Sequence, residues 1–189
     1  MVISRRDHLV QVAQDEFAAH GFHGTGIDGL LAKAGVSKKT LYAHFRSKEE
    51  LIVAVLRGHD TNFRDDFKRD VEALADDPKE RLLAVFDVAS DWFHEKSFYG
   101  CIFINAVAEY SEGTSPIREA CRDFKQMMKT YIIDLARDAS LPQPGVIGAQ
   151  LALLLEGATV TAQVSGDKNA ALIAKEAARS LIASALTPA

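Results

Sequence analysis

Apolar and polar positions follow helical spacing over the first fifty residues and predict three short helices. The first opens at Ser4, which forms a capping pair with Asp7, and we expect Gly21 to stop it in a left-handed conformation. Its inward face consists of Leu9, Val12, Ala13 and Phe17. One apolar face along the segment indicates a helix that packs against neighbours.

The second helix is expected to be short and to end at a tight turn. We expect Thr25, with Asp28 three residues later, to cap its start and Gly35 to end it. The residues expected to face inward are Ile27, Leu30, Leu31 and Ala34. A helix of about two turns is not stable alone, so this one needs its neighbours.

A third helix is expected over residues 38–45, directly after the turn Gly35-Val36-Ser37. Ser37 is placed to cap it, while Leu41 and Phe45, four residues apart, can pack inward. The side chains left for the exposed face are Lys38, Lys39, Thr40, Tyr42 and His44. This face is rich in hydrogen-bond donors and contains no acidic residue.

Helical periodicity continues through the rest of the chain, without strand-like alternation of useful length. Ser47 and Glu50 predict the start of a long helix, and Asp77 with Pro78 predicts the start of the next. The apolar stripe of the long helix consists of Leu51, Val55, Phe63, Phe67, Val71 and Leu74. Later helices are expected over 101–110, from 116 onward, over 146–165 and over 168–186, with a linker at 142–145. The sequence therefore predicts an all-α chain.

Composition and charge divide this all-α chain into a small basic part and a larger acidic part. The 189 residues are 48% apolar and 25% charged, with a net charge of −4, which is ordinary for a globular protein. Residues 1–48 hold seven Lys or Arg and four Asp or Glu, a net charge of +3, so the remainder carries −7. The asymmetry suggests different partners for the two parts.

Two short helices joined by a glycine-containing turn, the second with a basic and hydroxyl-rich face, are typical of helix-turn-helix DNA readers. Lys, Thr, Tyr and His side chains can contact phosphates and base edges in the major groove. The alternative is that these are solvated surface helices of a bundle, because the same geometry occurs in proteins that bind no DNA.

The segment from Thr25 to Leu51 closely resembles the DNA-binding segment of the TetR/AcrR family of transcriptional regulators. The matching positions are Thr25, Ala34-Gly35-Val36-Ser37, Leu41-Tyr42, His44-Phe45 and Ser47-Lys48, and earlier Ala13, Phe17 and Gly21-Phe22. The resemblance covers roughly residues 5–55. Leu31 and Lys39 depart from it, since the family more often has Ala and Gly there.

The resemblance implies roles for the matching residues. It implies phosphate contacts for Thr25, Lys38, Tyr42, His44 and Lys48, and positions near base edges for Ser37, Lys39 and Thr40. It also implies about nine helices, with a helix-turn-helix domain over 1–47 and a helical effector-binding and dimerisation domain over 48–189. So short a recognition helix reads few base pairs, which favours a symmetric dimer on a palindromic double-stranded operator.

The last two predicted helices are dense in Ala and Gly, which let helices approach closely. Such a pair is either internal core or half of a dimeric four-helix bundle, and the resemblance favours a homodimer through these two helices.

A small-molecule effector pocket is expected among the middle helices, which carry aromatic and Met side chains and few polar ones. The expected apolar lining is Trp92, Phe93, Phe98, Tyr99, Phe103, Met127, Met128 and Tyr131, with Asn105, Glu109, Gln150, Thr159 and Gln163 as polar anchors. The alternative interpretation is plain core, which is the more frequent reason for such a stripe. The scarcity of charges favours a neutral or weakly polar effector.

Other classes of protein fit the sequence less well. It has no catalytic motif, no metal-ligand spacing and no cofactor-binding motif, and it shows neither a signal peptide nor an uninterrupted membrane span. A helical adaptor for another protein is disfavoured by the basic face from Lys38 to Lys48. The main alternative is a redox-responsive regulator switched through Cys101, which is expected near a helix N-terminus that lowers thiol pKa.

We predict a cytoplasmic, dimeric repressor that a small molecule releases from its operator, with the long helix carrying the change.

Overall fold

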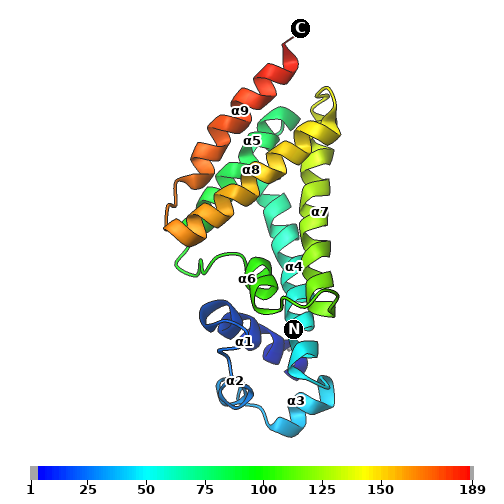
Figure 1. The fold of residues 1–189 in the computed structure, drawn as a ribbon, viewed down its shortest axis with the longest axis vertical. Coiled ribbons are helices and arrows are strands. Elements are labelled where there is room, and N and C mark those ends of the chain that lie inside the picture. Colours follow the sequence, from blue (N-terminus) through cyan, green and yellow to red (C-terminus); the bar gives the residue numbers. More distant parts are fainter. Residues whose placement is uncertain (1–3, 188–189) are drawn as a thin grey trace. The chain divides into compact units, whose positions relative to one another are not determined.

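The computed structural model describes residues 4–187, and all regular structure in that range is α-helical, as predicted (Figure 1). The helices are α1 (Arg5–His20), α2 (Ile27–Ala34), α3 (Lys38–His44), α4 (Lys48–Leu74), α5 (Pro78–His94), α6 (Ile102–Glu109), α7 (Pro116–Asp138), α8 (Pro144–Ser165) and α9 (Ala170–Leu186).

Contacts divide the described chain into two compact units. The first contains the described residues of Met1–Asn62 together with Ile102–Phe124, and the second contains Phe63–Cys101 with the described residues of Lys125–Ala189. Helices α4 and α7 therefore contribute residues to both. This division by contacts differs from the division by function predicted at residue 47/48, because the first unit also takes the start of α4, all of α6 and the start of α7.

The core of the first unit forms where α1, α2 and α3 pack on one another (Figure 1). Its buried residues include Leu9, Phe17, Phe22, Leu30, Leu41 and Phe45. The rings of Phe17 and Phe22 lie 5.0 Å apart, so the loop after α1 is part of this core. Val12 and Ile27, expected inside, are only half-buried.

Local capping signals set most helix ends in the first unit. The Ser4 hydroxyl accepts the Asp7 N–H at 3.1 Å, and Gly35 ends α2 in the left-handed conformation, with φ 63° and ψ 30°. Both features confirm the predictions. Gly21 also ends α1 with positive φ, but its ψ of 166° is extended, so the expected left-handed helical conformation is wrong.

The expected cap at Thr25 is also wrong, because Gly26 is the N-cap of α2 and no side chain bonds to it there. The Thr25 hydroxyl points back instead and donates to the Gly21 carbonyl at 2.7 Å. The Thr25 hydroxyl, which was expected to cap α2, therefore bonds to the end of α1 instead.

The second unit is built on mutual packing of α5, α8 and α9, which lie together in Figure 1. Asp77 caps α5 by accepting the Lys79 and Glu80 N–H groups, and Pro78 is its first residue, as predicted. Buried alanines on α8 and α9, including Ala158, Ala162, Ala171 and Ala178, let these helices approach closely. Lys175 on α9 also pairs with Asp87 on α5 at 2.6 Å.

Some predicted boundaries and faces differ from the structure. Helix α8 begins two residues earlier than predicted, at Pro144, because proline suits a first helical turn. Helix α6 begins at Ile102 and not at Cys101, after Gly100 with φ 86°. Leu74, expected inside, is 56% exposed because α4 ends there.

Within the described residues, α8 is the helix whose length and apolar composition would suit a membrane span. Of the most apolar 18-residue stretch of α8, 44% is buried inside the protein.

Gly148 provides a test of the close packing in the second unit. A Cβ there would lie 2.6 Å from the backbone Cα of Ile133 on α7, whereas a Cβ on Gly145 would meet nothing within 4 Å. We expect Gly148→Ala to lower the free energy of unfolding by about 1–3 kcal/mol through overpacking. Gly145→Ala, the matched control on the same helix, should raise it by a few tenths to about 1 kcal/mol. Urea unfolding measures both, and equal effects would contradict the packing.

Candidate functional site

The exposed face of α3 is held in place by two buried side chains on its other face. Leu41 is 1% exposed and Phe45 is 2% exposed, and both face the core of the first unit. Lys38, Lys39, Tyr42 and His44 are exposed, and Thr40 is half-buried. The structure therefore brings together on one surface the residues expected on the DNA-facing side.

Ser37 and Thr40 form the start of α3. The Ser37 hydroxyl oxygen accepts the Thr40 N–H at 3.1 Å, and the two hydroxyl oxygens lie 3.0 Å apart. A capping hydroxyl fixes the first turn of a helix and leaves its remaining N–H groups available to an anion. These two residues thus orient the end of α3 from which Lys38 and Lys39 project.

The cations of this face differ in their neighbours. Lys38 lies 3.3 Å from the Asp28 carboxylate, and both side chains are largely exposed, so this ion pair contributes little to stability. Lys39 has no ion pair within residues 4–187. Lys48 is half-buried at the first residue of α4. Arg46, two residues before Lys48, is also exposed. It was not among the expected DNA-binding residues, although its charge contributes to the basic character of residues 1–48.

Thr25, for which the resemblance implies a phosphate contact, is buried and so differs from the exposed residues of α3. It is 6% exposed, and its hydroxyl donates to the Gly21 carbonyl at 2.7 Å and faces the Glu16 carbonyl at 3.3 Å. The hydroxyl proton is therefore used inside the protein. Its phosphate role stays a prediction.

The residues expected to line an effector pocket are distributed over both units. Phe103, Asn105 and Glu109 belong to the first unit. Trp92, Phe93, Met127, Tyr131, Gln150 and Thr159 belong to the second, as do Phe98, Tyr99, Met128 and Gln163. Their common role as one pocket stays a prediction.

Several of these residues have partners inside their own unit. Glu109 accepts hydrogen bonds from the loop after α1, and the Thr159 hydroxyl donates to the Leu155 carbonyl at 2.9 Å. The Trp92 and Phe93 rings lie 5.0 and 5.2 Å from the Phe98 ring, and the Trp92 ring also lies 5.2 Å from the Phe63 ring. Gln150 is exposed.

Tyr131 differs from the others because its hydroxyl is buried without a hydrogen-bond partner in the described part of the chain. Burial, and then the Glu72 carboxylate, raise the pKa of Tyr131 to about 12, while Arg81 acts in the opposite direction. The Lys68 ammonium lies 5.2 Å from the centre of the ring. A neutral hydroxyl able to donate or accept is therefore present inside the second unit.

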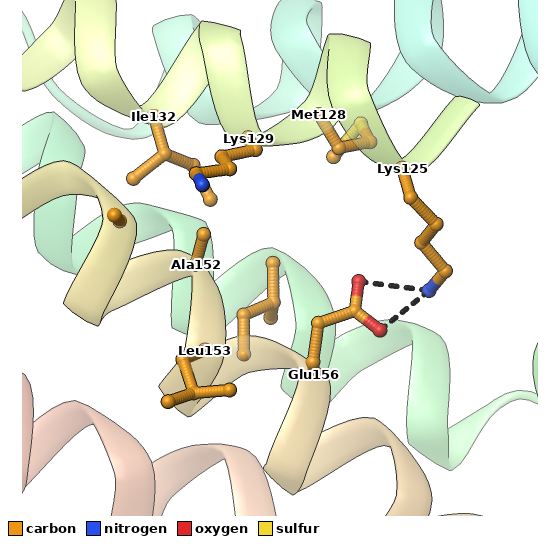
Figure 2. A pocket seen from close by; sticks show the side chains of 9 residues that line it. Lys125, Met128, Lys129, Ile132, Ala152, Leu153 and Glu156 are labelled. Atoms are coloured by element: carbon orange, nitrogen blue, oxygen red, sulfur yellow. Dashed lines mark hydrogen bonds and ion pairs between the residues drawn. The ribbon is translucent and has the colours of Figure 1, made fainter. Parts of the chain in front are cut away.

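A cleft of about 330 Å³ lies between α7 and α8, also within the second unit (Figure 2). Met128, Ile132, Ala152 and other apolar side chains line it. Figure 2 shows Lys125 and Glu156 reaching toward each other at one end of the cleft. The Lys125 ammonium lies 2.6 Å from the Glu156 carboxylate. Sequence reasoning missed this cleft, because it placed Met128 in a pocket with aromatic residues.

No group of three or more His, Cys, Asp or Glu side chains in the described residues is arranged to hold a metal ion. Cys101 and Cys121 are both buried thiols. The Cys101 N–H donates to the Gln163 side-chain oxygen at 3.1 Å.

Comparison with known families agrees with this geometry. Residues 9–55 match the model for "Bacterial regulatory proteins, tetR family", and residues 78–178 match "Tetracyclin repressor-like, C-terminal domain". Together the two matches cover more than half of the chain. The chain belongs to the TetR family. The family consists of bacterial regulatory proteins.

Individual relatives and structures support the same family. The chain is 33% identical over 123 residues to the transcriptional activator FasR of Mycolicibacterium smegmatis, an alignment that covers 63% of this chain and 56% of FasR. It is 28% identical over 116 residues to the transcriptional repressor NemR of Escherichia coli, covering 61% of this chain and 58% of NemR. The chain thus aligns with little more than half the length of these curated relatives.

Solved structures extend the similarity over the whole fold. SCO4454, a TetR-family regulator from Streptomyces coelicolor, superposes with a TM-score of 0.88 at 26% identity, covering 97% of this chain and 96% of SCO4454. The reduced form of E. coli NemR gives a TM-score of 0.83 at 24% identity, covering 94% and 97% of the two chains. The NemR structure shows the shared fold.

Thr25 allows a structural role to be separated from a DNA contact. Thr25→Val keeps the shape but leaves the Gly21 carbonyl without its donor, so we expect a loss of about 1–2 kcal/mol in the free energy of unfolding. Ser37→Ala should cost about 1 kcal/mol, as for loss of an N-cap. Urea unfolding in the absence of DNA measures both. Wild-type stability in Thr25→Val would show that the internal bond is not important and would favour the phosphate role.

Proposed function

We propose that the protein is a cytoplasmic, homodimeric repressor that binds a palindromic operator and is released by a small-molecule effector. The observation that carries the DNA-binding part is the exposed face of α3, on which Lys38, Lys39, Tyr42 and His44 project from a helix anchored by buried Leu41 and Phe45. A recognition helix presents such a face to the major groove, where cations meet phosphates and Lys39 can reach a guanine edge.

Exposed apolar residues on α8 and α9 support the homodimer. Leu153 is 73% exposed and Val164 is 78% exposed on α8, and Ile173 is 66% exposed on α9. Val146, Val160, Leu172 and Leu186 are also exposed. On α8 the exposed residues Val146, Leu153, Val160 and Val164 are seven, seven and four positions apart and so form one stripe, which is characteristic of a helix packed in a bundle. Pairing with the same helices of a second copy would bury it and would account for the apolar character of α8.

The buried hydroxyl of Tyr131 supports an effector site in the second unit. A buried polar group without a partner is costly, and a ligand atom that bonds to it recovers that cost. The surrounding charged groups are Lys68, Glu72 and Arg81. We propose that a neutral or weakly polar effector places a hydrogen-bonding group against Tyr131.

The proposed release mechanism is a difference in effector affinity between two conformations. An effector that prefers the conformer with wrongly spaced recognition helices weakens operator binding, and operator DNA weakens effector binding by the same factor. Helix α4 is suited to carry the change because residues 48–62 belong to the first unit and residues 63–74 to the second.

The redox alternative depends on access to Cys101. NemR, whose reduced form is among the similar structures, directs attention to cysteine chemistry. Cys101 is 4% exposed, however, and its backbone N–H is fixed by Gln163. Redox-sensing thiols are accessible, so the burial favours an effector over a thiol switch.

Selection from a random DNA pool tests the DNA-binding proposal. We expect wild-type protein to enrich a palindrome that Tyr42→Ala no longer binds. Lys39→Ala should cost about 1–3 kcal/mol and relax the preference at one base position, if Lys39 reads a base edge. Lys168→Ala, an exposed lysine outside α3, is the matched control and should leave binding unchanged.

Absence of any enriched sequence with wild-type protein would contradict the operator proposal. A reporter gene under the enriched palindrome tests the direction of regulation. Higher expression when the protein is deleted supports repression, and lower expression contradicts it.

Tyr131→Phe tests the unpartnered hydroxyl. Because the substitution removes a buried group without a partner and keeps the ring under Lys68, we expect the effector-free protein to become more stable by about 1–2 kcal/mol. Compounds that raise the melting temperature of the wild type should do so less in the variant. A less stable Tyr131→Phe protein would show that the hydroxyl already has a partner and would contradict this part of the proposal.

A further inference from the structure

Glu109, the last residue of α6, bonds to a loop 86 residues earlier in the chain. Its Oε1 accepts the Phe22 N–H at 2.8 Å, and its Oε2 accepts the His23 N–H at 2.6 Å. The Nδ1 atom of the His23 ring lies 2.9 Å from the same Oε2. One carboxylate thus holds two consecutive backbone amides and a side chain of the loop between α1 and α2.

Tyr110, the next residue, contacts the same two loop residues. Its ring stacks on the His23 ring with centres 4.8 Å apart, and it meets the Phe22 ring edge-on at 6.2 Å. The end of α6 therefore grips the loop by hydrogen bonds from Glu109 and by ring contacts from Tyr110.

The end of α6 is itself held by α7. The Arg118 guanidinium donates to the Tyr110 carbonyl at 3.2 Å and to the Val107 carbonyl at 3.4 Å. A cation at the C-terminal end of a helix satisfies carbonyls that lack intrahelical partners and opposes the negative end of the helix dipole. Glu109 consequently projects from a fixed segment and not from a frayed helix end.

The loop that Glu109 holds determines where α2 begins. Phe22 is fully buried against Phe17, and the Thr25 hydroxyl is bonded to the Gly21 carbonyl. Gly21 leaves room for the carboxylate, because a Cβ there would lie 3.0 Å from Glu109 Oε1. Fixing residues 21–25 therefore fixes the start of α2 and, through α2, the turn that precedes α3.

The carboxylate is stabilised in its charged form. Burial acts to raise the pKa of Glu109, but the backbone N–H groups of His23 and Phe22, and then the His23 ring, outweigh it and hold the pKa below its ordinary value. A depressed pKa means that the contribution to stability is present at neutral pH and is lost as the pH falls through that lowered value.

We propose that Glu109 is a positioning residue for operator binding: from α6 it fixes the α1–α2 loop and thereby the placement of the recognition helix. This role rests on the proposed function, and it assigns Glu109 to the DNA-binding unit rather than to the effector. Glu109 itself touches no DNA in this proposal. Removing its charge should alter operator affinity without changing the number of phosphate contacts.

Glu109→Gln is the test, with Glu112→Gln as matched control. Glu112 is an exposed carboxylate three residues further along, and it makes no hydrogen bond to the loop within the described chain. In Glu109→Gln we expect amide hydrogen exchange of Phe22 and His23 to accelerate at least tenfold. Operator affinity should fall about tenfold with an unchanged salt slope, because that slope counts phosphate contacts. Glu112→Gln should change none of the three quantities.

His23 supplies a rescue experiment. His23→Ala removes the ring donor and should weaken operator binding, whereas His23→Asn places an amide N–H near the former Nδ1 and should restore much of it. Failure of His23→Asn to exceed His23→Ala would overturn the part assigned to the ring.

The remaining outcomes separate the two proposals. Faster exchange in Glu109→Gln with wild-type operator affinity would overturn the positioning role and leave a structural contact only. A smaller salt slope would also overturn it, because Glu109 would then influence a phosphate contact directly. If wild-type protein enriches no DNA while the exchange of Phe22 and His23 still responds to Glu109→Gln, the proposed function has failed and the loop contact has not.

Discussion

Burial of Leu41 and Phe45 is the constraint on which the exposed face of α3 depends. A seven-residue helix such as α3 forms too few internal hydrogen bonds to be stable in water, so it persists only while these two side chains remain in the core. The same packing decides which side chains are left outside. Lys38, Lys39 and Tyr42 face solvent because the opposite side of the helix is packed in the core. The chemistry of the exposed surface is thus a consequence of core packing.

The loops of the first unit depend on single polar groups that replace missing backbone partners. Ser37 satisfies an N–H at the start of α3, Thr25 satisfies a carbonyl at the end of α1, and Glu109 satisfies two amides of the intervening loop. Buried or half-buried backbone groups need such partners, and each partner defines one position of the loop. A unit assembled from short helices therefore owes its exact arrangement to polar contacts as well as to apolar burial.

What could be predicted from the sequence follows from how local the signals are. Gly35, Ser37 and the Leu41–Phe45 spacing act within a few residues, and the structure places α3 as they indicate. Thr25 looked like a cap for the same local reason, but the carbonyl of Gly21 competes for its hydroxyl. The contact of Glu109 with Phe22 and His23 joins residues 86 and 87 positions apart, and no periodicity reports it. The unpartnered hydroxyl of Tyr131 is equally invisible in sequence, because it is a property of everything packed around the ring.

The ion pair between Lys38 and Asp28 has a consequence for the proposed DNA contact of α3. In the free protein, Asp28 already supplies Lys38 with a counterion, 3.3 Å away. When a phosphate replaces that carboxylate as the partner of Lys38, one ion pair is exchanged for another. The gain in binding free energy is therefore smaller than for a lysine that has no partner in the free protein. In the proposed complex, non-specific duplex would therefore be held less tightly than the number of cations on α3 suggests.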